Sequence, residues 1–160
     1  MFRKMRRFKQ QLSNDEALEI LKNCKSGVLA VSGDDGYPYT VPLNFVYADG
    51  KIYFHCAKSG HKLDAVRAND KVSFCVIDKN EVDAEKLTTL FKSVVVFGRA
   101  KIMSDTEKIK SAMTMFGLKY NNDVAAVEKE IQRERNGLCC VEISIEHITG
   151  KQAIELMKKE

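Results

Sequence analysis

Several familiar signatures are missing from this sequence, and each absence argues against a class of protein. The cysteines contain no CxxC pair, and their odd number does not suit a secreted disulfide framework. No stretch approaches the roughly 18 apolar residues that cross a membrane, and no apolar run follows the charged N-terminus. No glycine-rich dinucleotide turn is present. We therefore expect a cytoplasmic protein without a metal site, whose cysteines are structural free thiols: Cys24, Cys56, Cys75, Cys139 and Cys140.

The composition is that of one globular domain over residues 1–160. Hydrophobic residues make up 44% and charged residues 30% of the chain, unlike the polar composition of disordered chains. Five basic residues and no acidic residue fall within residues 1–10, so a basic arm over residues 1–12 precedes a body of net charge −1, which is +4 minus 5. Such an arm can contact nucleic acid or a phosphorylated cofactor, but a solvated end explains it more simply.

Only two prolines occur, and both fall in one predicted strand, residues 37–47. Proline cannot donate a hydrogen bond to a sheet, so Pro38 and Pro42 place this strand at an edge or at a bulge. Asp-Gly turns separate it from the runs 28–31 and 51–56, which predicts an antiparallel meander. A capping box at Ser13 predicts a helix before the first of these strands.

The remaining pattern adds strands and peripheral helices. We predict helices over 59–69, 105–118 and 123–135, strands over 72–77, 91–103 and 138–145, a loop over 79–90, and a C-terminal tail over 149–160. Since most strand connections are short, the sequence predicts a mainly β (α+β) fold: a six-stranded antiparallel barrel or sheet with helices packed outside. A doubly wound parallel fold would need a helix between nearly every pair of strands.

One segment has the pattern of an anion site. A strand ends near Cys56, and a helix begins near Gly60, so backbone N–H groups converge with the Ser59 hydroxyl and the Lys62 ammonium. Both side chains suit a phosphate monoester. An ordinary capped helix with a solvated lysine fits this local pattern equally well.

The same region carries a family resemblance. Residues 35–47, 52–55, 59–62 and 91–100 are similar in order and spacing to the FMN-binding split barrels of the pyridoxamine 5'-phosphate oxidase-like superfamily, in particular to its Nim-like branch, named for nitroimidazole resistance. The resemblance covers about residues 6–148. It implies a split β-barrel that works as a homodimer, with FMN in a groove at each end of the subunit interface.

The resemblance also assigns cofactor-binding residues. Val41, Pro42 and Leu43 are expected along the isoalloxazine, with main-chain groups near Asn44 at its polar edge, although packing in the core would also explain Val41 and Leu43. His61 and Lys62 match the basic pair on the FMN phosphate, with Ser59 nearby; relatives often carry arginine where His61 stands. Ser93 and Val94 match the strand that reaches the flavin from the other subunit.

His55 is the candidate catalytic residue, because it matches a histidine beside the flavin in Nim-like proteins. It could donate a proton to a substrate that the flavin reduces. Alternatively, it could only stabilise, by hydrogen bonding, the turn before Ser59 that would hold the FMN phosphate. The neighbouring Cys56 points to the opposite face of the strand, so the two do not form a catalytic pair.

Three functions are compatible with these residues. The first is an FMN-dependent reductase or oxidase of a small oxidised molecule, with NAD(P)H as electron donor; the second is a flavin-binding store or redox sensor without a substrate. The third, a nucleic-acid-binding domain, is disfavoured because Tyr53 and Phe54 lack basic neighbours. Pyridoxamine-phosphate oxidase activity itself is disfavoured too, because its C-terminal arginine-containing motif is not found after Leu138.

Overall fold

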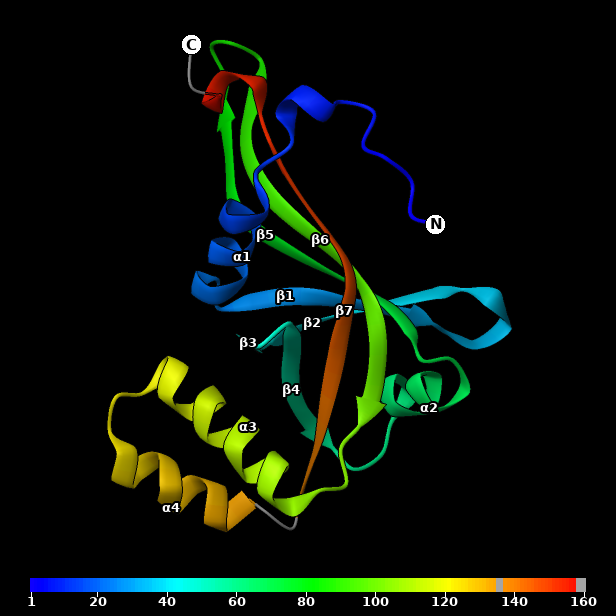
Figure 1. Cartoon of the computed structure of the whole chain (residues 1–160), viewed down its shortest axis with the longest axis vertical. Helices are drawn as coiled ribbons and strands as arrows, with labels where there is room; N and C mark the ends of the chain where they lie inside the picture. Colours follow the sequence, from blue (N-terminus) through cyan, green and yellow to red (C-terminus); the bar gives the residue numbers. More distant parts are fainter. Residues whose placement is uncertain (135–136, 158–160) are drawn as a thin grey trace.

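Seven antiparallel strands form one sheet in the order β2-β1-β5-β6-β7-β4-β3 (Figure 1). The computed structural model describes residues 1–134 and 137–157. The strands are β1 (Ser26–Ser32), β2 (Pro38–Asn44), β3 (Val46–Ala48), β4 (Lys51–Ala57), β5 (Lys71–Asp83), β6 (Thr88–Ile102) and β7 (Leu138–Gln152). The helices are α1 (Asn14–Asn23), α2 (His61–Ala68), α3 (Thr106–Tyr120) and α4 (Val124–Glu134), with 3-10 turns η1 (Phe8–Gln10), η2 (Asp34–Gly36) and η3 (Ile154–Leu156).

The two edge strands of this sheet are consecutive in the chain. β2 and β3 are separated only by Phe45, so the chain passes there from one edge of the sheet to the other, and the sheet curls into a barrel-like form. Phe45 is fully buried, with its ring edge-on to Phe74 at 5.0 Å. The antiparallel prediction is confirmed, whereas the count of six strands is wrong because burial of Phe45 divides the predicted strand 37–47 in two. The prolines do lie on an edge strand, as their chemistry requires.

The Asp-Gly turns are formed as the sequence predicts. Asp49 and Gly50 have φ values of 49° and 75°, the two positive values of a type I′ hairpin turn that joins β3 to β4. Asp35 and Gly36, with φ values of 53° and 80°, form the turn between β1 and β2.

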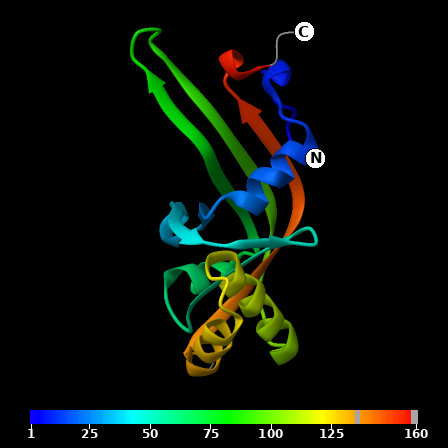
Figure 2. The same ribbon diagram turned by 90° about the vertical axis from the view of Figure 1, so that its left-hand side faces the viewer.

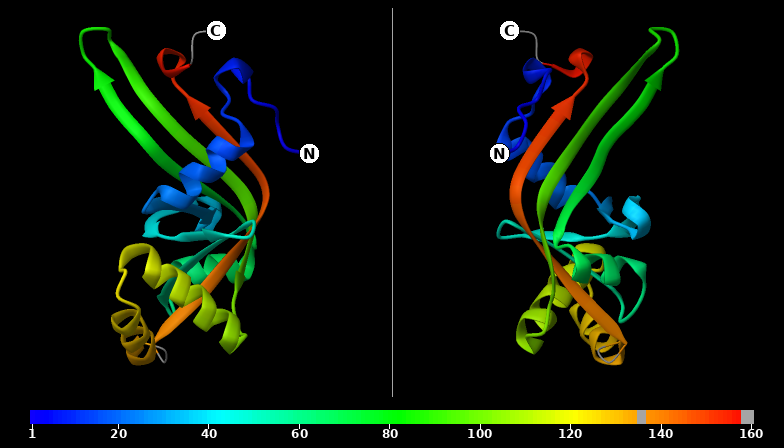
Figure 3. Two further views of the ribbon diagram at one scale, coloured as in Figure 1. Left: turned by 60° about the vertical axis from the view of Figure 1, so that its left-hand side comes forward. Right: turned by 90° about the vertical axis from the view of Figure 1, so that its right-hand side faces the viewer.

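A long hairpin of β5 and β6 projects beyond the barrel (Figures 2 and 3). Residues 79–90, predicted as a loop, form the outer part of this hairpin, with pairs running from Lys79 opposite Lys92 to Asp83 opposite Thr88. A register shift between Ile77 and Lys79 marks where the ribbon leaves the barrel. Because most of this outer part of β5 is exposed, the alternation that reveals a half-buried strand is missing from its sequence.

The C-terminal strand is also longer than predicted. β7 continues to Gln152 and is followed by η3, so the predicted tail 149–160 is wrong for its first residues, and residues 158–160 lie outside the described residues. The extension pairs with β6 on one side and is covered by the arm and α1 on the other. A Cβ on Gly150 would lie 2.9 Å from the Cβ of Leu12 and 3.1 Å from that of Ala17, which only glycine avoids.

The basic arm therefore does not behave only as a solvated end. Leu12 is buried, Gln11 bridges to Lys151 of β7, and the ring of Phe2 stacks on His147 at 4.7 Å. The arm adds strand-like and aromatic contacts to one end of the sheet.

Side chains cap the starts of α1 and α3. The capping box at Ser13 is complete, and the Asp105 side chain accepts from the N–H groups of Glu107 and Lys108 at the start of α3. α3 and α4 form a hairpin at the end of the molecule opposite the projecting ribbon (Figure 3). No described helix is both long and apolar enough to cross a membrane.

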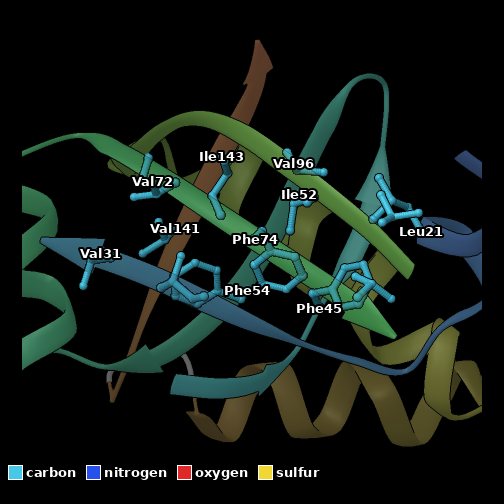
Figure 4. Close-up of a cluster of buried hydrophobic side chains, with 14 of the residues drawn as sticks. Leu21, Val31, Phe45, Ile52, Phe54, Val72, Phe74, Val96, Val141 and Ile143 are labelled. Carbon is cyan, nitrogen blue, oxygen red and sulfur yellow. The ribbon is translucent and has the colours of Figure 1, made fainter. Parts of the chain in front are cut away.

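The barrel encloses the main hydrophobic core. Phe54 of β4, Phe74 of β5 and Ile143 of β7 point into it from three strands, with Leu21 of α1 at one end (Figure 4). All four are 2% exposed or less. Burial of a Phe, Leu or Ile side chain contributes roughly 1.5–3 kcal/mol each, so this core holds the strands that carry the site below.

Candidate functional site

The turn between β4 and α2 leaves backbone donors open. Gly60 is the N-cap of α2 with a φ of 127°, a value that favours glycine, and no side chain caps the helix. The Gly60 carbonyl accepts from Leu63 and Asp64, at 2.9 and 3.2 Å, and the preceding N–H groups of the first turn have no intrahelical partner. The expected capping role of the Ser59 hydroxyl is therefore not observed; Ser59 is exposed in the turn just before the cap.

Lys62 lies in the first turn of α2 and is half-buried. It forms no ion pair with any residue in the described ranges, whereas Arg67 on the same helix pairs with Asp64 at 2.8 Å. Its ammonium lies within electrostatic reach of two neighbours: it adds to the lowering of the His55 pKa that burial causes, and it opposes the raising of the Cys56 pKa by burial. An unpaired cation thus stands beside an open helix N-terminus, a combination that suits an anion.

His55 is held near the end of β4, opposite Cys140 of β7. Burial lowers the pKa of its imidazole below the ordinary value of 6.5; Glu134 opposes this shift, and Lys62 adds to it. The ring lies edge-on to Phe116 of α3 at 4.6 Å and makes no hydrogen bond with the residues that the structure describes. His55 is therefore a mainly neutral imidazole at pH 7 whose two nitrogens are available to a ligand.

β2 presents an open sheet edge on the same barrel. Its residues alternate: Val41 and Leu43 pack against the core, while Pro42 and Asn44 are exposed. β2 pairs with β1 alone, so the main-chain groups along its other side have no strand partner. This is the surface on which the family resemblance places the flavin ring.

His61 has contacts of a different kind. Its ring stacks on Tyr39 of β2, with centroids 4.2 Å apart, and its Nε2 lies 3.6 Å from a carboxylate oxygen of Asp34 in the β1–β2 turn. His61 thus joins the start of α2 to β2. The carboxylate competes with any anion for this imidazole, so Lys62 is the stronger candidate for a phosphate contact.

Ser93 and Val94 lie far from His55 within one chain. They pair with Lys151 and Gly150 of β7, about ten residues further along that strand than Cys140, which pairs with His55. At about 3.3 Å per residue this amounts to roughly 30 Å. Val94 is fully buried, and Ser93 is half-buried. A single subunit therefore does not bring Ser93 to His55.

A cavity of about 700 Å³ opens between the α3–α4 hairpin and the barrel, with His55 and Asn44 in its wall. This cavity was not predicted from the sequence. Its helical lining includes Met113, Phe116 and Tyr120 of α3 and Val127 and Ile131 of α4. These residues are three and four apart on α3 and four apart on α4. That spacing was visible in the sequence, but it predicts an apolar helix face without indicating that part of the face lines a cavity.

The end of α3 fastens the bend at Phe45. The Lys119 ammonium donates to the carbonyls of Cys24 and Phe45, at 2.6 and 2.9 Å, and its pKa is lowered, mainly by burial. The Tyr120 hydroxyl accepts from the Phe45 N–H at 3.3 Å and lies 2.9 Å from the Phe45 carbonyl, which it can donate to. These two side chains fix the backbone next to Asn44.

The cysteines are all free thiols. Cys139 and Cys140 differ in exposure as their neighbouring strand positions predict: Cys140 is buried, and Cys139, opposite Cys56, is half-buried. Burial, together with Cys139 and Cys56, raises the pKa of the Cys140 thiol to about 11. Within the described ranges no three His, Cys, Asp or Glu side chains gather as a metal site would require.

Comparisons with known proteins agree with this architecture. A protein from Mycobacterium tuberculosis of unassigned function superposes with a TM-score of 0.81 at 19% identity, covering 98% of this chain and 95% of that one. A protein assigned to 5-nitroimidazole antibiotic resistance, from Bacteroides thetaiotaomicron, gives 0.73 at 18% identity, with 88% and 85% coverage. An FAD-binding protein from Mesorhizobium loti gives 0.65 at 28% identity, with 89% and 96% coverage.

Sequence comparison identifies the family. No curated protein sequence matches the chain. The sequence model described as pyridoxamine 5'-phosphate oxidase matches residues 13–152, which include every strand and the whole β4–α2 turn. The chain therefore belongs to the pyridoxamine 5'-phosphate oxidase family.

Proposed function

We propose that this protein binds FMN and reduces a small oxidised molecule. The observation that carries the proposal is the unpaired Lys62 ammonium at the open N-terminus of α2, within electrostatic reach of His55. Lys62, the first N–H groups of α2 and the Ser59 hydroxyl would hold the phosphate. Val41, Pro42 and Leu43 would flank the ring, with main-chain groups near Asn44 at its polar edge. The FAD-binding relative from Mesorhizobium loti supports a flavin as ligand.

The monophosphate is favoured over a dinucleotide. The chain offers one site of monophosphate size and no glycine-rich turn for a pyrophosphate. A bound flavin would supply hydride and electron transfer, with NAD(P)H as the proposed donor. The protein's own part would be to bind, to orient and to provide a proton at His55. The resemblance to nitroimidazole-resistance proteins supports reduction of a nitro compound; a flavin-binding sensor without a substrate is the alternative.

The proposed site needs two copies of the chain. The family resemblance assigns Ser93 to the flavin. Its partner on β7 lies about ten residues along that strand from Cys140, the partner of His55, so Ser93 would serve the site of a second copy. The projecting β5–β6 hairpin carries Val82 and Leu87 at 76% and 92% exposure. Leu87 also has a φ of 50°, which costs a leucine conformational energy that an apolar contact would offset. We propose a homodimer in which this ribbon contacts the partner.

Lys62→Ala tests the phosphate site. The variant should bind FMN about 10- to 100-fold more weakly, roughly 1.5–3 kcal/mol for a lost charge-assisted hydrogen bond. Its affinity for riboflavin, which lacks the phosphate, should hardly change. Lys129→Ala, which removes an exposed charge from α4, is the control. Fluorescence quenching of both flavins provides the affinities, and equal weakening of FMN and riboflavin by Lys62→Ala would exclude the phosphate role.

A further inference from the structure

The cavity between α3–α4 and the barrel has two unlike walls. On one side Phe116 and Tyr120, one helical turn apart on α3, have ring centroids 5.1 Å apart. On the other side α4 contributes Val127 and Ile131. The helices approach closely near one point, where a Cβ on Gly117 would lie 2.4 Å from a methyl of Val127. The space between them is therefore a slot held by close helix packing.

The barrel contributes two polar side chains to the wall of this slot. His55 of β4 offers an imidazole with no hydrogen-bond partner in the described chain, and Asn44 contributes from the end of β2. An apolar cavity with a few convergent polar groups is the usual form of a small-molecule site, and its volume of about 700 Å³ is within the range that such sites occupy. The rings of Phe116 and His55, edge-on at 4.6 Å, favour an aromatic ligand.

The charges around the slot disfavour an anion. The described residues that line it include two carboxylates, Glu130 and Glu134, but no lysine or arginine, and the His55 imidazole is mainly neutral at pH 7. Arg133 pairs with both carboxylates, but it is itself 70% exposed and does not line the slot. An anionic ligand would face these carboxylates without a compensating cation in the described lining.

We propose that this slot binds a neutral, planar aromatic molecule, placed with one edge at His55. This inference rests on the proposed function, because the ligand would be the substrate that His55 protonates. The slot itself is distinct from the phosphate site at the start of α2. Occupation of the slot should therefore depend on the α3–α4 hairpin and should not depend on Lys62.

Two adjacent alanines on α4 provide a matched test. Ala126 lines the slot, whereas Ala125 is exposed and does not line it. Equilibrium dialysis of the full chain against 1-naphthalenemethanol, with and without FMN, measures binding of a neutral two-ring probe. Ala126→Phe should weaken it about tenfold or more, because a pocket resolves even a single added carbon group; Ala125→Phe should leave it unchanged. 1-Naphthoate, the anion of the same ring system, should bind wild type at least about tenfold more weakly.

The outcomes separate this proposal from the proposed function. Probe binding that falls in Ala126→Phe with FMN affinity intact supports the slot, and probe binding without any FMN binding would overturn only the flavin proposal. Absence of probe binding, equal effects of the two alanine variants, or naphthoate binding as tightly as the alcohol would overturn the slot as described. A loss of FMN affinity in Ala126→Phe would overturn it too, by assigning the slot to the flavin. Met113→Trp, which fills the slot from α3, repeats the test if Ala126→Phe fails to fold.

Discussion

At the scale of single residues, His55 is the group whose surroundings suit proton transfer. It is half-buried, its ring contacts Phe116, and Lys62 and Glu134 act on it electrostatically. His55→Gln should retain FMN, because glutamine fills similar space and can hydrogen-bond, while it slows substrate reduction by about 100-fold or more. Reduction of bound flavin by NAD(P)H should hardly change. Stopped-flow measurement of the two half-reactions separates them, and an unchanged substrate half-reaction would rule out the catalytic role.

The lowered pKa of His55 also fixes the direction of a pH effect. Since burial keeps the imidazole neutral down to a pH below its ordinary pKa of 6.5, the proton-donating form becomes populated only on the acidic side of that value. Substrate reduction in wild type should therefore speed up as the pH falls from 8 through 6, and His55→Gln should lose this dependence. A profile that is flat in wild type, or equally steep in His55→Gln, contradicts proton donation by this residue.

At the scale of elements, the end of α3 controls the bend between β2 and β3. Tyr120→Phe removes a hydroxyl that contacts both main-chain groups of Phe45, so buried backbone atoms lose a partner. The free energy of unfolding should fall by about 1–3 kcal/mol, and FMN affinity should fall with it because Asn44 is adjacent. Tyr37→Phe, at a position 76% exposed, is the matched control and should have no effect on either quantity. Urea denaturation of both variants measures the difference, and equal stabilities would mean that the hydrogen bonds between Tyr120 and the Phe45 backbone do not stabilise the fold.

Elements were predictable where local chemistry defined them. The capping box at Ser13 and the Asp-Gly turns act within a few residues, and their elements formed as expected. Two kinds of strand were missed for a physical reason. The outer part of the β5–β6 ribbon is largely exposed, and the end of β7 is stabilised by Leu12 and Ala17 from the opposite end of the chain, so neither leaves a local hydrophobic pattern.

The candidate site also contains residues that the sequence predicted and residues that it did not. Lys62 and His55 belong to one short segment, in which the anion-site pattern indicated Lys62 and the family resemblance indicated His55. The slot was not predictable, because it is formed by β2, β4, α3 and α4 together, and the periodicity of Phe116 and Ile131 indicates only an apolar helix face. The hydrogen bonds from Lys119 to the carbonyls of Cys24 and Phe45 could not be predicted either, because a lysine near a helix C-terminus is ordinarily a solvated charge.

At the scale of the whole molecule, the projecting ribbon predicts a second copy. Light scattering of the FMN-bound protein should give about 36 kDa, twice the 18.1 kDa of one chain. Leu87→Asp at the tip of the ribbon should weaken the dimer, since a charge would replace an apolar contact. Val124→Asp, which places the same charge at an exposed position of α4, should leave it intact. A flavin-bound protein of 18 kDa would contradict a site completed by a second copy.

The central proposal is that this chain holds the monophosphate flavin through the start of α2. Titration of purified wild-type protein with FMN and, separately, with riboflavin, followed by flavin fluorescence, tests it most directly. We expect quenching that saturates at one FMN per chain, with riboflavin bound about 10- to 100-fold more weakly for want of the phosphate contact. A protein that leaves FMN fluorescence unchanged, or that binds riboflavin as tightly as FMN, would contradict it.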